Sequence, residues 1–198
     1  MIKPFTVSVP DSTLEEIYNK IKNYPWKEIP NLDGWEYGSN LNYMKEFSKY
    51  WISNFDWKKQ EAEINKFSNF VTNVDDIDIH FIKEKGSGSN PMPLLILHGW
   101  PGSIVEFLYI IEKLAHPERF GGKEEDAFDV IVPSLPGFGF SGCPSHPIGP
   151  RKMAEIFNKL MTKNLGYKNY LSQGGDWGAT ISNWLGYDHS KFCSGIHL

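Results

Sequence analysis

The sequence predicts an α/β protein, with a mainly helical leader in residues 1–90 and part of a parallel β-sheet, covered by helices on both faces, in residues 91–198. Two patterns carry this prediction. In the leader, apolar residues recur at the spacing of helix faces. In the remainder, short apolar runs alternate with helical segments, and parallel strands must be joined by crossover connections that place helices over the sheet.

The first part of the leader is expected to form two helices. Asp11 and Ser12 are placed to cap the first helix, which ends before Pro25. A turn-rich segment follows, which contains the helix-breaking residues Pro30, Gly34 and Gly38. The second helix carries a mostly aromatic face: Leu41, Met44, Phe47, Tyr50 and Trp51. Such a stripe is more typical of a core than of a ligand site, so we expect this face to be buried.

The rest of the leader is expected to contain a short helix after Asp56 and one or two strands within residues 71–83. An acidic cluster interrupts these strands at Asp75, Asp76 and Asp78. It lacks the glycine and the distal glutamate of an EF-hand loop, so a solvated turn is the expectation. Residues 86–90, Gly-Ser-Gly-Ser-Asn, are typical of a flexible connector and set the predicted domain boundary at residue 90.

The second half alternates as a parallel sheet requires. Four strands are predicted, at residues 93–98, 128–132 and 169–173 and from about Phe192. Three helices lie between them, from the N-cap Ser103 to about Ala115, across residues 151–164 and across residues 179–185.

A glycine-rich segment at residues 137–142 matches the G-x-G-x-x-G pattern of dinucleotide-binding proteins. However, its glycines do not open a helix, because three prolines keep the chain extended up to Arg151: Pro144, Pro147 and Pro150. No acidic residue stands where the ribose contact would be expected. We therefore expect no dinucleotide site here.

The segment from Gly174 to Ala179, Gly-Gly-Asp-Trp-Gly-Ala, joins a predicted strand to a predicted helix through a tight turn, which is the build of a nucleophile elbow. Bulk at positions 174, 178 or 179 would keep the helix from packing closely.

Asp176 occupies the position where such elbows usually carry Ser. A carboxylate is ionised at neutral pH without the help of a base, and a helix N-terminus favours the anion further. Attack on an sp3 carbon that bears a strained or good leaving group would give an alkyl ester, which points to epoxides or alkyl halides. The alternative is that Asp176 only N-caps the following helix.

The loop at residues 98–103 is the second candidate part of a site. In hydrolases with an elbow, this loop and the residue after the nucleophile supply the backbone amides that bind an oxyanion. The predicted donors are therefore the amides of Trp100 and Trp177. His98 is expected to brace the loop rather than to act as a base, with Gly99 and Pro101 as supporting residues.

Three segments, in this order, resemble the microsomal-type epoxide hydrolases of the α/β-hydrolase superfamily, a group that includes the juvenile hormone epoxide hydrolases: HGWPGS at 98–103, PSLPGFGFSG at 133–142 and GGDWGA at 174–179. The leader is similar to that family's N-terminal region in residues 2–5, 56–62 and 77–82. The resemblance implies an N-terminal epoxide-hydrolase region followed by an incomplete α/β-hydrolase core, truncated after the nucleophile elbow.

The resemblance also implies a reaction, the hydration of epoxides to vicinal diols through a covalent ester of Asp176. In the family, two tyrosines of a cap domain protonate the departing oxygen, and a His oriented by an acid activates water. These residues all follow the elbow in chain order. Neither His189 nor His197 is expected to reach Asp176, since they fall in the elbow helix region and the next strand. The chain is therefore expected to be a fragment that does not turn over alone.

Two alternatives stay open. The chain could be a truncated, non-catalytic product that binds a partner or an apolar ligand. It could also be part of a haloalkane dehalogenase, which likewise has Asp followed by Trp at the elbow. That family would place Asn or a similar halide donor where this chain has Trp100.

Composition limits the possible partners. A net charge of −4 without a long charged run argues against nucleic acid, and the expected substrate is a small apolar epoxide.

Cys143 and Cys193 have neither metal-ligand spacing nor a disulfide framework. No P-loop or H-E-x-x-H occurs, so we expect no cofactor and no metal. No apolar run reaches 18 residues, so the chain as written is expected to be soluble and cytoplasmic; attachment to the endoplasmic reticulum membrane would need the family's N-terminal anchor.

Overall fold

The computed structural model describes residues 1–26 and 34–198, and it consists of two compact units. The larger unit contains Met1–Val7 and Glu63–Leu198, and the smaller one contains Ser8–Ala62. The domain boundary predicted at residue 90 lies inside the larger unit, in the connection between two strands of its sheet. The turn predicted around Pro30 lies outside the described residues.

The larger unit is built on a sheet with the order β1-β2-β3-β5-β4-β6-β7. The strands are β1 (Lys3–Pro4), β2 (Asn69–Val74), β3 (Ile77–Glu84), β4 (Met92–Leu97), β5 (Phe128–Pro133), β6 (Tyr170–Gly174) and β7 (Cys193–His197). The four strands from the second half of the chain are parallel, as predicted. The strands of the leader pair antiparallel, and β3 joins β5 antiparallel, so the whole sheet is mixed.

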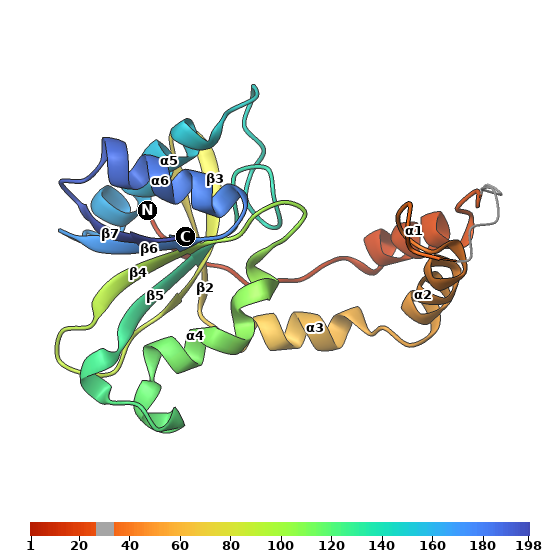
Figure 1. The fold of residues 1–198 in the computed structure, drawn as a ribbon, viewed down its shortest axis with the longest axis horizontal. Helices are drawn as coiled ribbons and strands as arrows, with labels where there is room; N and C mark the ends of the chain where they lie inside the picture. The colour runs from red at the N-terminus through yellow and green to blue at the C-terminus, as the bar shows by residue number, and fades with distance from the viewer. Residues whose placement is uncertain (27–33) are drawn as a thin grey trace. The chain divides into compact units, whose positions relative to one another are not determined.

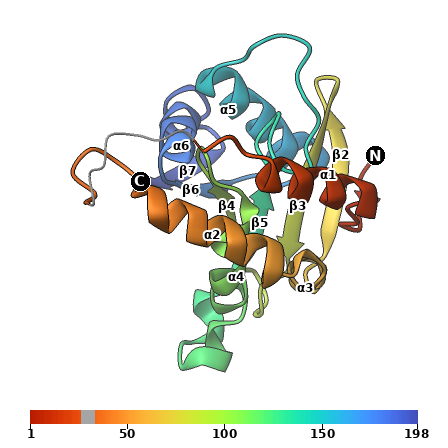
Figure 2. The ribbon, with the colours of Figure 1, turned by 90° about the vertical axis from the view of Figure 1, so that its right-hand side faces the viewer.

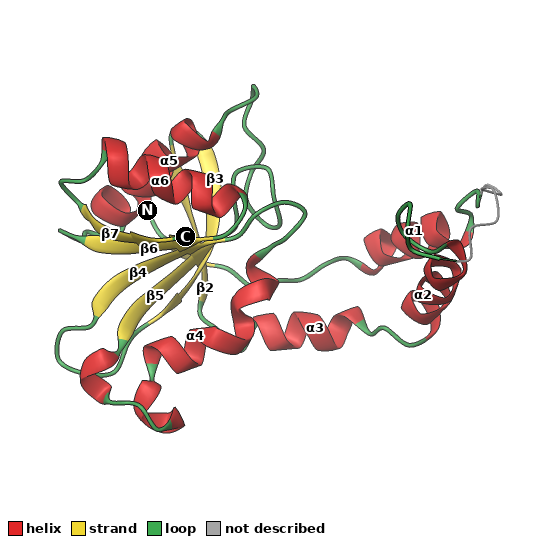
Figure 3. Cartoon of the chain, viewed as in Figure 1, coloured by secondary structure: helices red, strands yellow, loops and turns green. Residues whose placement is uncertain are grey.

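Helices cover both faces of this sheet, as predicted (Figures 1 and 2). On one face lie α5 (Pro150–Lys159) and α6 (Trp177–Asp188), which contact each other. On the other face lies α4 (Leu108–Ala115), which continues a 3-10 turn over Ile104–Phe107. The predicted helix at 151–164 is confirmed, although its last turn, Leu160–Asn164, has π geometry. Figure 3 shows long loops leading into α4 and α5.

The core of the larger unit lies between the sheet and the helices α5 and α6. Its buried side chains come from strands β2 to β7 and from the facing sides of the two helices, and they include Ile79, Phe81, Leu95, Leu97, Ile131, Met153, Phe157, Tyr170, Ile181 and Leu185. Removing each such side chain from water contributes about 1.5–3 kcal/mol to folding. The core therefore gives a firm base to the loops at the carboxyl ends of β4 and β6.

The smaller unit contains α1 (Asp11–Lys22), α2 (Leu41–Ser53) and most of α3 (Trp57–Ile64). The predicted cap of the first helix is wrong: Pro10 is the N-cap residue, and no side chain caps the helix. The predicted burial of the aromatic face is also wrong, since α2 has no buried residue and Phe47 and Tyr50 are 45% and 55% exposed. α2 packs on α1, and two packed helices leave their outer faces uncovered.

Among the described residues, no helix combines the length and the apolar character needed to cross a lipid bilayer.

Candidate active site

The predicted elbow is present between β6 and α6. β6 ends at Gly174, α6 begins at Trp177, and Asp176 stands between them with φ 52° and ψ −121°. A left-handed φ in a residue other than glycine costs about 1–3 kcal/mol and persists only where the surrounding structure holds it. The turn places the Asp176 side chain beside the loop that follows β4.

The small residues of the elbow have the steric reason that the sequence predicted. A Cβ at Gly174 would overlap the backbone of Gly178, and a Cβ at Gly178 would overlap the carbonyl of Leu97 at the end of β4. Gly175, by contrast, faces open space. Because residues 174 and 178 are glycines, the start of α6 can lie directly against the sheet.

The Asp176 carboxylate meets the loop that follows β4. Its Oδ1 accepts a hydrogen bond from the Trp100 amide at 2.8 Å. Hydrogen bonds from the amides of Trp100 and then Trp177 hold the pKa of Asp176 below its ordinary value, so the side chain is an exposed anion at neutral pH. Although Asp176 stands at the N-cap position of α6, its side chain makes no capping hydrogen bond. The simple capping interpretation therefore does not account for this residue.

Gly99 allows the loop to approach this closely. A Cβ at residue 99 would overlap Oδ1, Cβ and Cγ of Asp176. Trp100 and Pro101 follow, joined by a cis peptide bond. Ser103 then begins the 3-10 turn with a capping box, in which the Ser103 amide donates to Oε1 of Glu106 at 3.0 Å.

His98 braces this loop and does not contact Asp176. The imidazole is buried, with Nδ1 2.9 Å from the carbonyl oxygen of Gly99 and Nε2 3.1 Å from the amide nitrogen of Leu135. Burial lowers the pKa of His98, against smaller opposite effects of the Gly99 hydrogen bond and of the Glu106 charge. The glycine-rich segment at 137–142 lies beside this imidazole, and Phe138 packs edge-on against it. This segment does not open a helix, since the next helix, α5, begins only at Pro150.

The elbow and the loop that follows β4 border an open hollow of about 570 Å³ at the carboxyl ends of β4 and β6. It is lined by Leu97, His98, Gly99, Trp100, Pro101, Gly102, Glu106, Phe107, Gln173, Gly175 and Asp176. Asp176 and residues 98–101 were predicted from the sequence, whereas Glu106 and Gln173 were not. The S-x-x-E spacing of Ser103 and Glu106 is a capping-box signal that would have placed Glu106 at this turn. Nothing in the sequence marks Gln173.

The other candidate groups lie elsewhere. His189 follows the last residue of α6 and His197 ends β7, and neither lines the hollow. Both cysteines are free, Cys143 exposed and Cys193 buried. Across residues 1–26 and 34–198, no group of His, Cys, Asp and Glu is arranged to hold a metal ion.

Comparison with known proteins matches the chain to two families. The family described as "Epoxide hydrolase N terminus" matches residues 2–107, and the family described as "alpha/beta hydrolase fold" matches residues 92–198. Similar proteins include a putative epoxide hydrolase of Stigmatella aurantiaca (strain DW4/3-1), at 39% identity over the whole chain and 45% of that protein. Epoxide hydrolase 1 of Sus scrofa is 38% identical, over the whole chain and 44% of that protein.

Among solved structures, the juvenile hormone epoxide hydrolase of the silkworm Bombyx mori matches with a TM-score of 0.86 and 32% identity, over the whole chain and 52% of that structure. The chain therefore spans about half the length of the relatives that it matches.

Proposed function

The chain belongs to the epoxide hydrolase family of the α/β-hydrolase superfamily, and on that premise we propose that the complete protein hydrates a small apolar epoxide to a vicinal diol through an ester of Asp176. The observation that carries this proposal is the carboxylate at the elbow, held at Oδ1 by the Trp100 amide. An elbow Ser would need a base, whereas this carboxylate is a nucleophile as it stands. The lining of the hollow by Trp100, Phe107 and Pro101 suits an apolar substrate.

In the first step, a carboxylate oxygen of Asp176 attacks a ring carbon of the epoxide. A carbon–oxygen bond to the enzyme forms, the ring carbon–oxygen bond breaks, and the freed oxygen takes a proton from a general acid. The oxygen held by Trp100 is oriented by the loop, so we assign the attack to the other oxygen, Oδ2. Oδ1 then becomes the carbonyl oxygen of the ester.

In the second step, water adds to Cγ of the ester after giving a proton to a base. Negative charge develops on Oδ1, where the amides of Trp100 and Trp177 are the proposed donors. Collapse of this intermediate breaks the bond from Cγ to Oδ2, and the departing oxygen takes the proton of the newly formed carboxyl group, which releases the diol and restores the carboxylate. Among the described residues, His98 is the only imidazole that lines the hollow, and both of its nitrogens are engaged. We therefore place the general acid and the base in the half of the complete protein that this chain does not span.

This proposal is tested by isotope transfer in the complete protein. Styrene oxide is mixed with excess enzyme in ¹⁸O-water for a single turnover. Because the second step adds water to Cγ, the first diol should contain only ¹⁶O, and the ¹⁸O should appear in Asp176. Direct attack of water on the epoxide would instead put ¹⁸O into the first diol and would contradict the ester route.

The matching variant is Asp176→Asn, which keeps the size of the side chain and removes the anionic nucleophile. We expect diol formation to fall by at least about 10³-fold with an unchanged thermal unfolding midpoint. Intact mass must exclude deamidation back to Asp. An inactive wild-type protein that binds the epoxide without reacting would favour the non-catalytic alternative.

A further inference from the structure

We infer that His98 is a positioning residue that locks the Gly99–Trp100 peptide in the one orientation that presents the Trp100 amide to Asp176; this inference rests on the proposed function. The imidazole does not touch the carboxylate. It acts on the carboxylate through the two ends of a single peptide unit.

The peptide between Gly99 and Trp100 is held at both ends. Its carbonyl oxygen, on Gly99, is 2.9 Å from Nδ1 of His98, and its amide nitrogen, on Trp100, is 2.8 Å from Oδ1 of Asp176. The C=O and the N–H of a trans peptide lie in one plane and point in opposite directions. Holding the carbonyl end toward the imidazole therefore directs the amide end toward the carboxylate.

Glycine at position 99 makes such a lock necessary. The approach of the loop requires glycine, because a Cβ there would overlap the Asp176 side chain. Glycine is also the residue whose backbone changes conformation most freely. A flipped peptide would point the Gly99 carbonyl at the Asp176 anion and would withdraw a hydrogen bond from Oδ1. The residue that gives the loop its clearance thus leaves the donor free to turn away unless another group holds it.

A second backbone group fixes the protonation state of His98. The Leu135 amide lies 3.1 Å from Nε2 and can only donate, so Nε2 must be unprotonated. The Gly99 carbonyl can only accept, so Nδ1 must carry the proton. The two partners therefore specify one neutral tautomer. The Phe138 ring fixes the imidazole from the side, with ring centroids 5.7 Å apart.

Replacing His98 with Asn or with Gln tests its two hydrogen bonds one at a time. In His98→Asn, the side-chain NH₂ group can reach the position of Nδ1 and keep the bond to the Gly99 carbonyl, while the bond from Leu135 is lost. In His98→Gln, the side-chain oxygen can reach the position of Nε2 and keep the bond from Leu135, while the bond to Gly99 is lost. The peptide lock thus predicts that Asn is the better replacement, although Gln is nearer in length to the whole imidazole.

The experiment follows both chemical steps in the complete protein with styrene oxide. Rapid quenching and intact-mass analysis give the rate of ester formation and the rate of ester hydrolysis separately. Loss of one oxyanion donor typically costs about 10²–10³-fold. We expect His98→Gln to slow ester hydrolysis by about 10²-fold, so that the ester accumulates, and His98→Asn to stay within about tenfold of the wild type. Equal slowing in both variants, or loss of ester formation and hydrolysis together, would overturn the lock.

A second measurement reads the wild-type protein and does not depend on the reaction rates of the variants. The ¹⁵N NMR spectrum of histidine-labelled wild-type protein, assigned with His98→Asn, reports which ring nitrogen carries the proton. We expect Nδ1 to be protonated and Nε2 to be bare. A proton on Nε2 is incompatible with the Leu135 contact and would overturn the inference. If the wild-type protein forms no ester, by contrast, the proposed function is contradicted, and so is the inference about His98 that rests on it.

Discussion

At Gly178, a methyl group has no room, because a Cβ would overlap the carbonyl of Leu97 and come within 3.0 Å of the carbonyl oxygen of His98. Two backbones meet there, so no side chain can rotate out of the way. We expect Gly178→Ala to lower the free energy of unfolding by about 1–3 kcal/mol, as overpacking does, and to lower the thermal unfolding midpoint accordingly. Gly175→Ala, in the same turn but facing open space, is the matched control and should change stability by less than about 0.5 kcal/mol. Equal effects would show that α6 does not lie this close to β4.

His80 is a second buried histidine, and it predicts how stability depends on pH. Its Nδ1 and Nε2 each lie 3.0 Å from a buried polar oxygen, Ser134 Oγ and Asn69 Oδ1. The imidazole is 0% exposed, and burial lowers its pKa to about 4.

Because the folded-state pKa of His80 is below the unfolded value of about 6.5, the unfolded chain binds the proton first as the pH falls. Stability should therefore be lost between about pH 6.5 and pH 4, by at most about 3 kcal/mol from this residue. Unfolding measured against pH should show a shallower loss in His80→Asn than in the wild type. The matched substitution His146→Asn, at an exposed position, serves as the control for replacing an imidazole with an amide. An unchanged slope in His80→Asn would mean that His80 is not the titrating group.

The residues of the candidate site divide into those that sequence could find and those that it could not. Asp176 and Trp100 stand in short motifs whose mechanism dictates their position. The hydrogen bond between His98 and Leu135 spans 37 residues, and the network around His80 joins two strands and a loop. No local pattern reports such long-range partners, so the bracing of the loop was predicted while its second partner was not.

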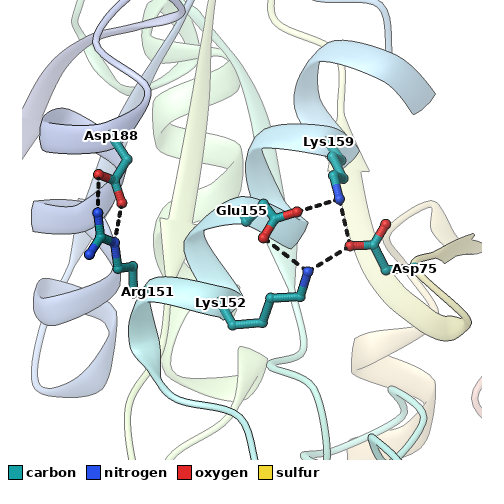
Figure 4. Close-up of polar contacts among 6 residues, drawn as sticks. All are labelled: Asp75, Arg151, Lys152, Glu155, Lys159 and Asp188. Carbon is teal, nitrogen blue, oxygen red and sulfur yellow. Dashed lines mark hydrogen bonds and ion pairs between the residues drawn. The ribbon is translucent and has the colours of Figure 1, made fainter.

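At the scale of elements, two sets of ion pairs connect α5 to its neighbours, one to the β2–β3 turn and one to α6 (Figure 4). Asp75, in the β2–β3 turn, contacts Lys152 and Lys159 of α5 at 3.0 and 2.6 Å, and Glu155 contacts both lysines as well. Arg151 of α5 pairs with Asp188 of α6 through two hydrogen bonds and lies over the Trp184 ring. The turn was expected to be solvated, and Asp75, Asp76 and Asp78 are exposed; Asp75 also ties the turn to α5.

The Asp75 contacts are partly exposed, so their contribution should be small and sensitive to salt. Hydrogen bonds from Lys159 and then Lys152 lower the pKa of Asp75, which means that the stabilisation is present near neutral pH and is lost as the pH falls through the lowered value. Because Asn also tolerates a left-handed φ, Asp75→Asn removes the charge without disturbing a turn in which residue 75 has φ 50°.

We expect Asp75→Asn to lower stability by no more than about 1 kcal/mol at low ionic strength, with the difference disappearing in about 1 M salt. Asp76→Asn is the control, since Asp76 has a similar φ of 62° and no ion pair within the part of the chain that the structure describes. A loss that persists in high salt would assign the effect to the turn and not to the charge.

Whether a segment forms a helix or a strand could be predicted from the sequence better than which elements pack against it. The apolar runs that became β4 and β5 could be placed because burial on both faces leaves a continuous apolar pattern. The aromatic face of α2 shows the limit of this reasoning. Helical spacing establishes that Phe47, Tyr50 and Trp51 share one face, but it does not say which element, if any, covers it. Likewise, alternation in β2 and β3 predicts strands but not their antiparallel direction.

At the scale of the whole molecule, the larger unit has a second, apolar hollow of about 540 Å³ on the α4 face of the sheet. Strands β4, β6 and β7 form its floor and α4 forms its wall, and the lining includes Leu94, Ile96, Phe107, Ile110, Leu114 and Leu171. Ile110 is 37% exposed. Contiguous apolar surface of this kind in soluble proteins marks a contact site. Since the relatives are about twice as long as this chain, we expect their remaining half to have a counterpart here that covers this face.

Substituting Ile110 tests that expectation in the complete protein. Ile110→Lys would bury an unpaired charge under the covering segment, which is among the mechanisms that destabilise strongly. We expect the thermal unfolding midpoint to fall by about 4 °C or more. Tyr109→Lys is the control, because Tyr109 lies on α4 and is 86% exposed, and it should move the midpoint by no more than about 1 °C. In the 198-residue chain alone, Ile110→Lys should leave the midpoint nearly unchanged and reduce the binding of an apolar dye. Equal midpoints for the two variants of the complete protein would show that this face stays open to solvent.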